Sequence, residues 1–311
     1  MPGPYAHITL LHELMRAGTP ESIFSQSSGF QTALERYFHY AALGAVSPDY
    51  PNLARRDDSA VQWADTMHCT RAGEMIASGI RLVGGASGEA RDKQLAWFLG
   101  YCAHVVTDVT IHPVVQAKVG VYAENQRHHR VCEMNQDSYI YRRMKLGEIG
   151  VSDSFARSVA RCSTSGDGTG LDHDIVTLWE GMLEDLYPEQ FVTHPPMIAS
   201  WHRAFVATAS DCRAGEVRLF PLAGVIAAKM ELSYPAYEAV DRQYIEEQTV
   251  PSESPNLLHY DEIFDSAAEN VAVMWRVVER ALCAGDAAGL PLCEEWNLDT
   301  GRDGHDKLVF W

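Results

Sequence analysis

Residues 98–115 read FLGYCAHVVTDVTIHPVV and form the strongest pattern in the sequence. Apolar residues lie on nearly every side of it, which predicts a helix buried in the centre of the protein. His104, Asp108 and His112 interrupt the apolar run at steps of four residues. Each step advances about 40° around a helix axis, so the three polar side chains should project from one face. We expect Pro113 to end this helix or to open its last turn.

Further helices are expected on both sides of this one, because apolar residues recur at helical spacing and alternating strand patterns are scarce. The expected helices lie near residues 8–15, 31–42, 92–112, 125–143, 173–187, 196–212, 221–244 and 261–284, with loops over 47–59 and 285–311. The sequence therefore predicts an all-α protein. We expect one mainly helical domain, 1–311, in which a metal-site half, 1–161, is followed by a helical continuation and tail, 162–311.

Composition and charge limit the possible partners of the chain. With 46% hydrophobic residues it can bury a large core, and a net charge of −17 disfavours nucleic-acid backbones and anionic membrane surfaces as partners. No segment looks apolar for long enough to span a bilayer, and no secretory signal is visible at the start. Seven cysteines, none in a Cys-x-x-Cys pair, favour reduced thiols and hence a cytoplasmic location. The sequence does not indicate an oligomeric state.

The helix around Asp108 predicts a metal site. A buried helix cannot leave imidazoles and a carboxylate unpaired without a cost of several kcal/mol. Imidazole and carboxylate are ligand types that zinc, iron and manganese accept, and core polar groups satisfied within the protein are the alternative.

A second motif follows on the next expected helix. His129 and Glu133 are four residues apart, so they can hold one ion in common, whereas His128 fits the face of Glu133 less well. Asp137, a further turn on, is typical of a carboxylate that accepts a hydrogen bond from a ligating His. Cys69, Cys102 and Cys132 lie beside these motifs and are expected to be small buried residues, with thiolate ligation as the alternative.

The motifs, taken in order, resemble the zinc-dependent phospholipase C family, which includes the catalytic region of glycosylphosphatidylinositol phospholipase D. The resemblance covers about residues 4–140 and rests on five elements. These are His7 after a Pro, a Gly-x-x-x-Pro-Asp loop ending at Asp49, His68 in a helix, the His104/Asp108/His112 helix, and His129-x-x-x-Glu133. Singly, His7, His68 and Asp49 would read as ordinary residues. The resemblance implies a multi-helix domain of the phospholipase C/P1 nuclease type.

The resemblance also implies a site with two or three Zn²⁺ ions. One ion would be held by His68, His104 and Asp108, a second by His112, His129 and Glu133, and a third by His7 with Asp108 as a bridge. Asp49 would be the general base or the group that orients the attacking water. Secreted relatives use their processed N-terminal residue on the third ion. Here His7 lies close to Met1, so that site is either incomplete or completed by water or another side chain.

We therefore expect a zinc-dependent phosphoester hydrolase, first of all a phospholipase C-type phosphodiesterase whose substrate is a phosphoester such as a phospholipid. A phosphomonoesterase, nucleotidase or nuclease acting on a soluble substrate is the second enzyme reading. A metal-stabilised helical interaction module without catalysis is the alternative from another class. A carboxylate-bridged di-iron oxidase is less well supported, because its usual Glu-x-x-His pairs are missing from these motifs.

Overall fold

The all-α prediction is confirmed by the computed structural model, which describes residues 2–16, 19–24, 28–54, 58–151, 154–164, 170–213, 219–252, 256–284 and 295–311. The α-helices are α1 (Pro4–Leu14), α2 (Thr19–Ile23), α3 (Ser28–Arg36), α4 (Phe38–Gly44), α5 (Asp58–Cys69), α6 (Ala72–Gly85), α7 (Gly88–Val119), α8 (Tyr122–Tyr141), α9 (Ser154–Ala160), α10 (His173–Leu186), α11 (Pro188–Thr193), α12 (Ile198–Arg213), α13 (Pro221–Met230) and α14 (Tyr260–Ala284). Short 3-10 turns are η1 (Tyr50–Leu53), η2 (Arg142–Met144), η3 (Tyr237–Ala239) and η4 (Arg242–Tyr244).

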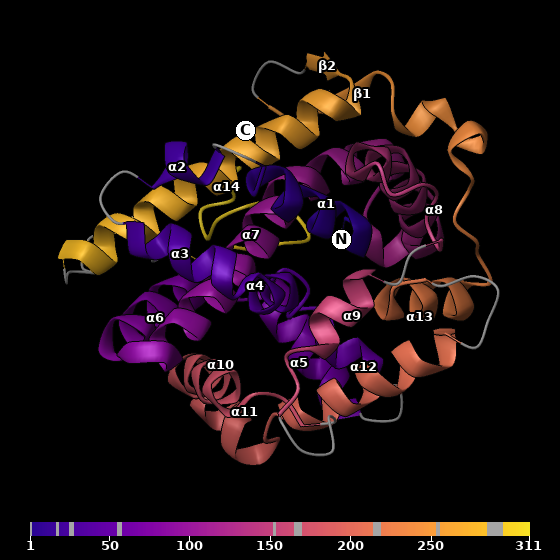
Figure 1. Ribbon diagram of the computed structural model, residues 1–311. Coiled ribbons are helices and arrows are strands. Elements are labelled where there is room, and N and C mark those ends of the chain that lie inside the picture. Colours follow the sequence, from indigo (N-terminus) through magenta and orange to yellow (C-terminus); the bar gives the residue numbers. More distant parts are fainter. Residues whose placement is uncertain are drawn as a thin grey trace.

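The described β structure is small. Strands β1 (Gln248–Val250) and β2 (Asn256–Leu258) pair antiparallel, with Gln248 opposite Leu258 and Val250 opposite Asn256. Figure 1 places this pair at the edge of the helical assembly, beside one end of α14. The core of the protein is therefore formed by packed helices.

The central element is α7, which contacts α4, α14 and α3 most extensively and also contacts α1 and α8. Figure 1 shows it in the middle of the molecule, with α14 on one side and α10, α11 and α12 on the opposite side of the assembly. Its residues from Gln94 to Val115 are all buried, as a helix that is apolar on every side requires. By length and composition α7 meets the criterion for a membrane span, contrary to the sequence expectation. Its apolar window is wholly buried inside the fold, which is typical of a core helix.

Two glycines allow α4 to cross α7 at very short range. A Cβ atom on Gly44 would lie 2.0 Å from the carbonyl oxygen of Trp97, and one on Gly100 would lie 2.0 Å from that of Ala41. Only glycine, which has no Cβ atom, fits at these two positions. The crossing brings the chain that follows Gly44, and with it the Asp49 turn, directly onto α7.

Three expectations about helix limits were wrong. Helix α7 continues past Pro113 to Val119, because one lost backbone hydrogen bond is outweighed by burial of Val114 and Val115 beyond it. The helix expected over 221–244 stops at Met230, since Glu231 adopts a left-handed conformation and Pro235 follows. The helix expected over 31–42 is two helices, separated at Tyr37.

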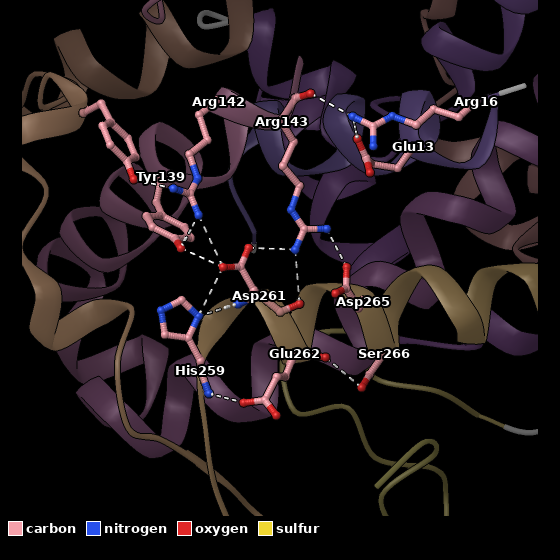
Figure 2. Close-up of polar contacts among 11 residues, drawn as sticks. Glu13, Arg16, Tyr139, Arg142, Arg143, His259, Asp261, Glu262, Asp265 and Ser266 are labelled. Carbon is pink, nitrogen blue, oxygen red and sulfur yellow. Dashed lines mark hydrogen bonds and ion pairs between the residues drawn. The ribbon is translucent and has the colours of Figure 1, made fainter. Parts of the chain in front are cut away.

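Ion pairs fasten the start of α14 to η2, the turn that follows α8 (Figure 2). Arg143 contacts the carboxylate of Asp261 at 2.7 Å and also pairs with Asp265, and its carbonyl oxygen accepts a hydrogen bond of 2.9 Å from Arg16 in the chain just after α1. Tyr139 donates to Asp261 at 2.6 Å. These contacts join the elements on either side of α7 into one frame.

Candidate metal centre

Asp108 is the centre of a buried group of histidines. Its Oδ1 lies 3.1 Å from Nε2 of His7, and its Oδ2 lies 3.3 Å from Nε2 of His104 and 3.7 Å from Nε2 of His68. These residues come from α1, α7 and α5, and each is at most 4% exposed. One carboxylate therefore faces imidazoles from three helices, with a different oxygen toward His7 than toward the other two.

Asp49 lies near the same ring atom of His68 that faces Asp108. Its Oδ1 is 3.6 Å from Nε2 of His68. The turn that carries it is fixed on α7, because Trp97 donates a hydrogen bond of 3.0 Å to the hydroxyl of Ser47, which in turn donates to the carbonyl oxygen of Leu43. The ligand atoms of Asp49, His68 and His104 form one group within 4.8 Å of one another.

Backbone carbonyls orient two of the imidazoles. Nδ1 of His68 lies 2.7 Å from the carbonyl oxygen of Ala64, and Nδ1 of His104 lies 2.9 Å from that of Ala45. Each ring must therefore carry its proton on Nδ1, which leaves the lone pair on Nε2. Among the residues described, neither Nε2 atom and neither oxygen of Asp108 has a hydrogen-bond partner.

The distances fit a divalent cation. In a tetrahedral zinc site with bonds of 2.0–2.1 Å, neighbouring ligand atoms lie about 3.3–3.4 Å apart. The separations from Asp108 Oδ2 to His104 and His68, 3.3 and 3.7 Å, are close to this value. Buried polar atoms without partners are costly, and a cation among them would satisfy several at once. The donor set is thus one that zinc accepts.

The electrostatics follow from burial and the Asp108 charge. Burial would raise the pKa of Asp108, but the imidazoles of His104 and His112 hold it well below its usual range. Burial would lower the pKa of His104, but the Asp108 carboxylate raises it. The pKa of His7 is lowered by burial and by its neighbour His104, whose ring stacks on it at 4.2 Å. Asp108 therefore remains an anion able to bind a cation.

The second predicted group is less tightly assembled. Nδ1 of His112 lies 2.6 Å from the carbonyl oxygen of Leu298, and Nε2 of His112 has no partner among the described residues. His129 has the opposite orientation, because its Nε2 lies 2.6 Å from the carbonyl oxygen of Gly120, so its Nδ1 faces Glu133 at 4.0 Å. Burial lowers the pKa of both imidazoles. The described residues do not bring His112, His129 and Glu133 into one group within 4.8 Å.

Arg130 is a charged neighbour of this second group that sequence reasoning missed. Its guanidinium donates to Oε2 of Glu133 at 2.7 Å and to the hydroxyl of Tyr122 at 3.0 Å, and its side chain is 9% exposed. Burial would raise the pKa of Glu133, but the charge of Arg130 lowers it. The i, i+3 spacing of Arg130 and Glu133 was the available signal. His128 is exposed on the other side of this helix.

Asp137 does not accept a hydrogen bond from a ligating histidine, contrary to expectation. It accepts from the backbone N–H groups of Ala6 at 2.7 Å and Tyr5 at 3.4 Å, and from the hydroxyl of Tyr234 at 3.2 Å. Burial raises its pKa to about 8. Asp137 thus caps the first turn of α1, whose early N–H groups lack helical partners, and so fixes the helix that carries His7.

One more residue near the site, His202, lies in a part of the chain where the sequence showed no motif. His202 of α12 lies 2.8 Å from the hydroxyl of Tyr50, the residue after Asp49, and 2.8 Å from that of Ser163. Cys102 and Cys132 are buried as expected, but Cys69 is exposed. The two contacts of His202 leave no local pattern in the sequence, because each joins residues more than 30 positions apart.

The comparisons with known proteins agree with this chemistry. A family model described as zinc dependent phospholipase C matches residues 6–188, which include every predicted ligand and Asp49. No curated protein and no solved structure matches the chain. The matched residues cover more than half of the chain, and the chain belongs to the zinc-dependent phospholipase C family.

Proposed function

We propose that this protein is a zinc-dependent phosphoester hydrolase, and specifically a phospholipase C-type phosphodiesterase. The observation that carries the proposal is the Asp108 carboxylate facing three buried imidazoles, with distances that fit a divalent cation. The family match supports the same chemistry and a phospholipid or related phosphoester as substrate.

The ligand assignment is part of the proposal. His68, His104 and Asp108 would hold one ion, and the carboxylate of Asp49 would lie beside it, within 4.8 Å of the ligand atoms of His68 and His104. Asp108 would bridge to a second ion at His7, since its other oxygen faces that ring. A further ion would be held by His112, His129 and Glu133. Bound zinc would lower the pKa of a water molecule toward ~7 and neutralise phosphoryl oxygens.

The chain supplies the remaining parts of the reaction. The carboxylate of Asp49 would accept the proton of the attacking water or hold that water in line, because it adjoins the ligands and has an oxygen without a partner among the described residues. The guanidinium of Arg130 would offset negative charge on the substrate at the other side of the site. Burial of the imidazoles excludes bulk water from the ligand positions.

The test combines metal analysis with a substrate panel. Protein purified without chelator should contain about two to three zinc ions per chain and cleave phosphodiesters in preference to phosphomonoesters. Asp49→Asn should lower kcat by about 10²–10³-fold, a loss typical of removing a positioned proton acceptor. Asp65→Asn, an exposed carboxylate on the same helix as His68, is the matched control and should retain wild-type turnover.

Each contrary result has a defined meaning. Zinc without turnover on any phosphoester would favour a structural metal module, and preferential cleavage of monoesters would favour a phosphatase. Wild-type turnover in Asp49→Asn would show that Asp49 does not act as the base. Protein with one zinc or none would contradict the cluster itself.

A further inference from the structure

The peptide unit of Leu298 connects two candidate ligands that lie on different helices. Its N–H donates a hydrogen bond of 2.7 Å to the carbonyl oxygen of His68, near the end of α5. Its carbonyl oxygen lies 2.6 Å from Nδ1 of His112 on α7. Leu298 is 186 residues from His112 in sequence and is fully buried. A single residue near the carboxyl end of the described chain therefore contacts both helices at their ligands.

The surrounding segment, residues 296–302, is built to hold that peptide in place. We call it the carboxyl-terminal loop. Asn297 and Arg302 pair across it as an antiparallel bridge, and Asn297 donates to the carbonyl oxygen of Cys69 at 3.3 Å. The carbonyl oxygen of Trp296 accepts from the N–H of Ala72 at 3.4 Å. The loop is thus fastened on both sides of the junction between α5 and α6.

Gly301 seats the loop against α7 at its proline. A Cβ atom there would lie 2.2 Å from Cγ of Pro113 and 2.5 Å from the carbonyl oxygen of Val109, the carbonyl that Pro113 leaves without its helical donor. Gly301 also has a φ of +65°, a backbone conformation that residues other than glycine rarely adopt. Position 301 therefore accepts only glycine if the loop is to reach His112, which directly precedes Pro113.

We propose that the carboxyl-terminal loop is a positioning element of the metal centre, in which the Leu298 peptide sets the ring of His112 and ties it to the helix of His68. This inference rests on the proposed zinc centre. It concerns residues outside the span 6–188 that matches the family.

The chemistry of histidine explains what the loop does. A carbonyl that accepts the Nδ1 proton fixes both the tautomer and the ring plane, and it leaves Nε2 as the metal-facing atom. The carbonyl of Ala64, one turn earlier in the same helix, does this for His68. The carbonyl of Ala45, at the end of α4, does it for His104. For His112 the acceptor is the Leu298 carbonyl. Partners of this kind change metal affinity by about 10–100-fold when they are lost.

Gly301→Val is the principal test, and zinc binding is the readout. We expect the variant to bind its weakest zinc about 10–100-fold less tightly than wild type in competition with a chromophoric chelator. Gly304→Val is the matched control, because a Cβ there makes only an ordinary contact, 3.5 Å from Glu295. It should retain wild-type affinity. Equal zinc affinity in Gly301→Val and wild type would overturn the proposal.

A second control separates positioning from general loss of stability. A Cβ on Gly79 would lie 2.1 Å from the ring of Phe98, so Gly79→Ala should lower the melting temperature without touching the carboxyl-terminal loop. We expect this variant to keep full zinc affinity. If it loses zinc to the same extent as Gly301→Val, the loop has no specific role and the proposal fails.

The wild-type protein offers a test that no folding failure can obscure. Nitrogen-15 NMR of metal-free protein should show a slowly exchanging Nδ1–H on His112, assigned by its absence in His112→Asn. A ring of His112 that carries its proton on Nε2 would overturn the inference. The proposed function would fail differently, since wild-type protein would then bind no zinc at all, whatever the tautomer of His112.

Discussion

Asp108 on α7 and Glu133 on α8 are both buried carboxylates among histidines, but they differ in their counter-charge. Asp108 faces three imidazoles, and no lysine or arginine pairs with it among the residues described. Glu133 receives a hydrogen bond of 2.7 Å from the buried guanidinium of Arg130. The first carboxylate has only titratable imidazoles as partners, whereas the second already has a permanent cation within the chain.

This difference predicts two kinds of metal site. The partners of Asp108 among the described residues are imidazoles, which lose their charge when they give up a proton, so an ion that binds there displaces protons and competes with no permanent cation. At Glu133 an ion must share the carboxylate with Arg130. The Asp108 site should therefore bind zinc more tightly and should contribute more to the stability of the metal-loaded protein.

Asp108→Asn should have the largest effect. The amide removes the charge that two ions would share, so the variant should lose both ions at His7, His68 and His104 and about 10³-fold in kcat/KM, a cost of roughly 4 kcal/mol. Metal-free Asp108→Asn should melt lower than metal-free wild type, because the amide loses the charge interactions with the imidazoles that hold the pKa of Asp108 well below its usual range. Metal analysis, turnover and calorimetry check these points, and a variant with its full zinc content would contradict the comparison.

Arg130→Gln should have a smaller effect than Asp108→Asn. Its main effect should be on the stability of the metal-free protein and not on zinc binding. It leaves Glu133 buried without its guanidinium, which should destabilise the metal-free protein by about 3–5 kcal/mol. Zinc should restore part of this stability, because Glu133 is then available to the ion. Urea unfolding with and without zinc measures both changes. Arg203→Gln, an exposed arginine on α12, is the control and should have little effect in either condition.

If metal-free Arg130→Gln is as stable as wild type, the ion pair does not balance Glu133 and the two carboxylates do not differ as proposed. A loss of stability that zinc leaves unchanged would show that Glu133 does not reach the ion. Either result would remove the distinction between the two sites.

The two sites also differ in how far the sequence predicted them. The spacing of His104, Asp108 and His112 placed three side chains on one buried helix, because helix geometry alone determines which residues share a face. The resemblance added His7 and His68, which no local pattern distinguishes from ordinary histidines. The structure brings both to Asp108 from separate helices.

The carbonyls that orient the imidazoles could not be predicted. The acceptors of His104 and His112 are backbone atoms 59 and 186 residues away, and any residue type supplies a carbonyl. Pro113 shows the reverse failure, in which a sound local rule was overridden by tertiary packing. The rule that proline ends a helix holds for isolated helices, but Val114 and Val115 are buried beyond it.

The last prediction concerns His202, which supports the turn that carries Asp49. Burial lowers the pKa of His202 to about 4, and its neutral ring bonds to the hydroxyl of Tyr50 beside Asp49. Above pH 6.5 His202 is neutral in both states and adds no pH dependence. As the pH falls from 6.5 toward 4, the unfolded chain binds a proton that the folded chain does not, so stability is lost.

Between pH 6.5 and 5 this loss amounts to about 2 kcal/mol at 1.36 kcal/mol per unit. His202→Gln should therefore lose about 2 kcal/mol less than wild type when metal-free protein is taken from pH 7 to pH 5. Its stability at pH 7 is lower as well, so only the difference between the two pH values is compared. Thr208→Ala, on the same helix, removes a side-chain hydrogen bond but no titratable group, so it is the control and should keep the wild-type slope. An unchanged slope in His202→Gln would mean that His202 is already protonated in the fold, and the support behind Asp49 would then be an ionic contact instead of a neutral one.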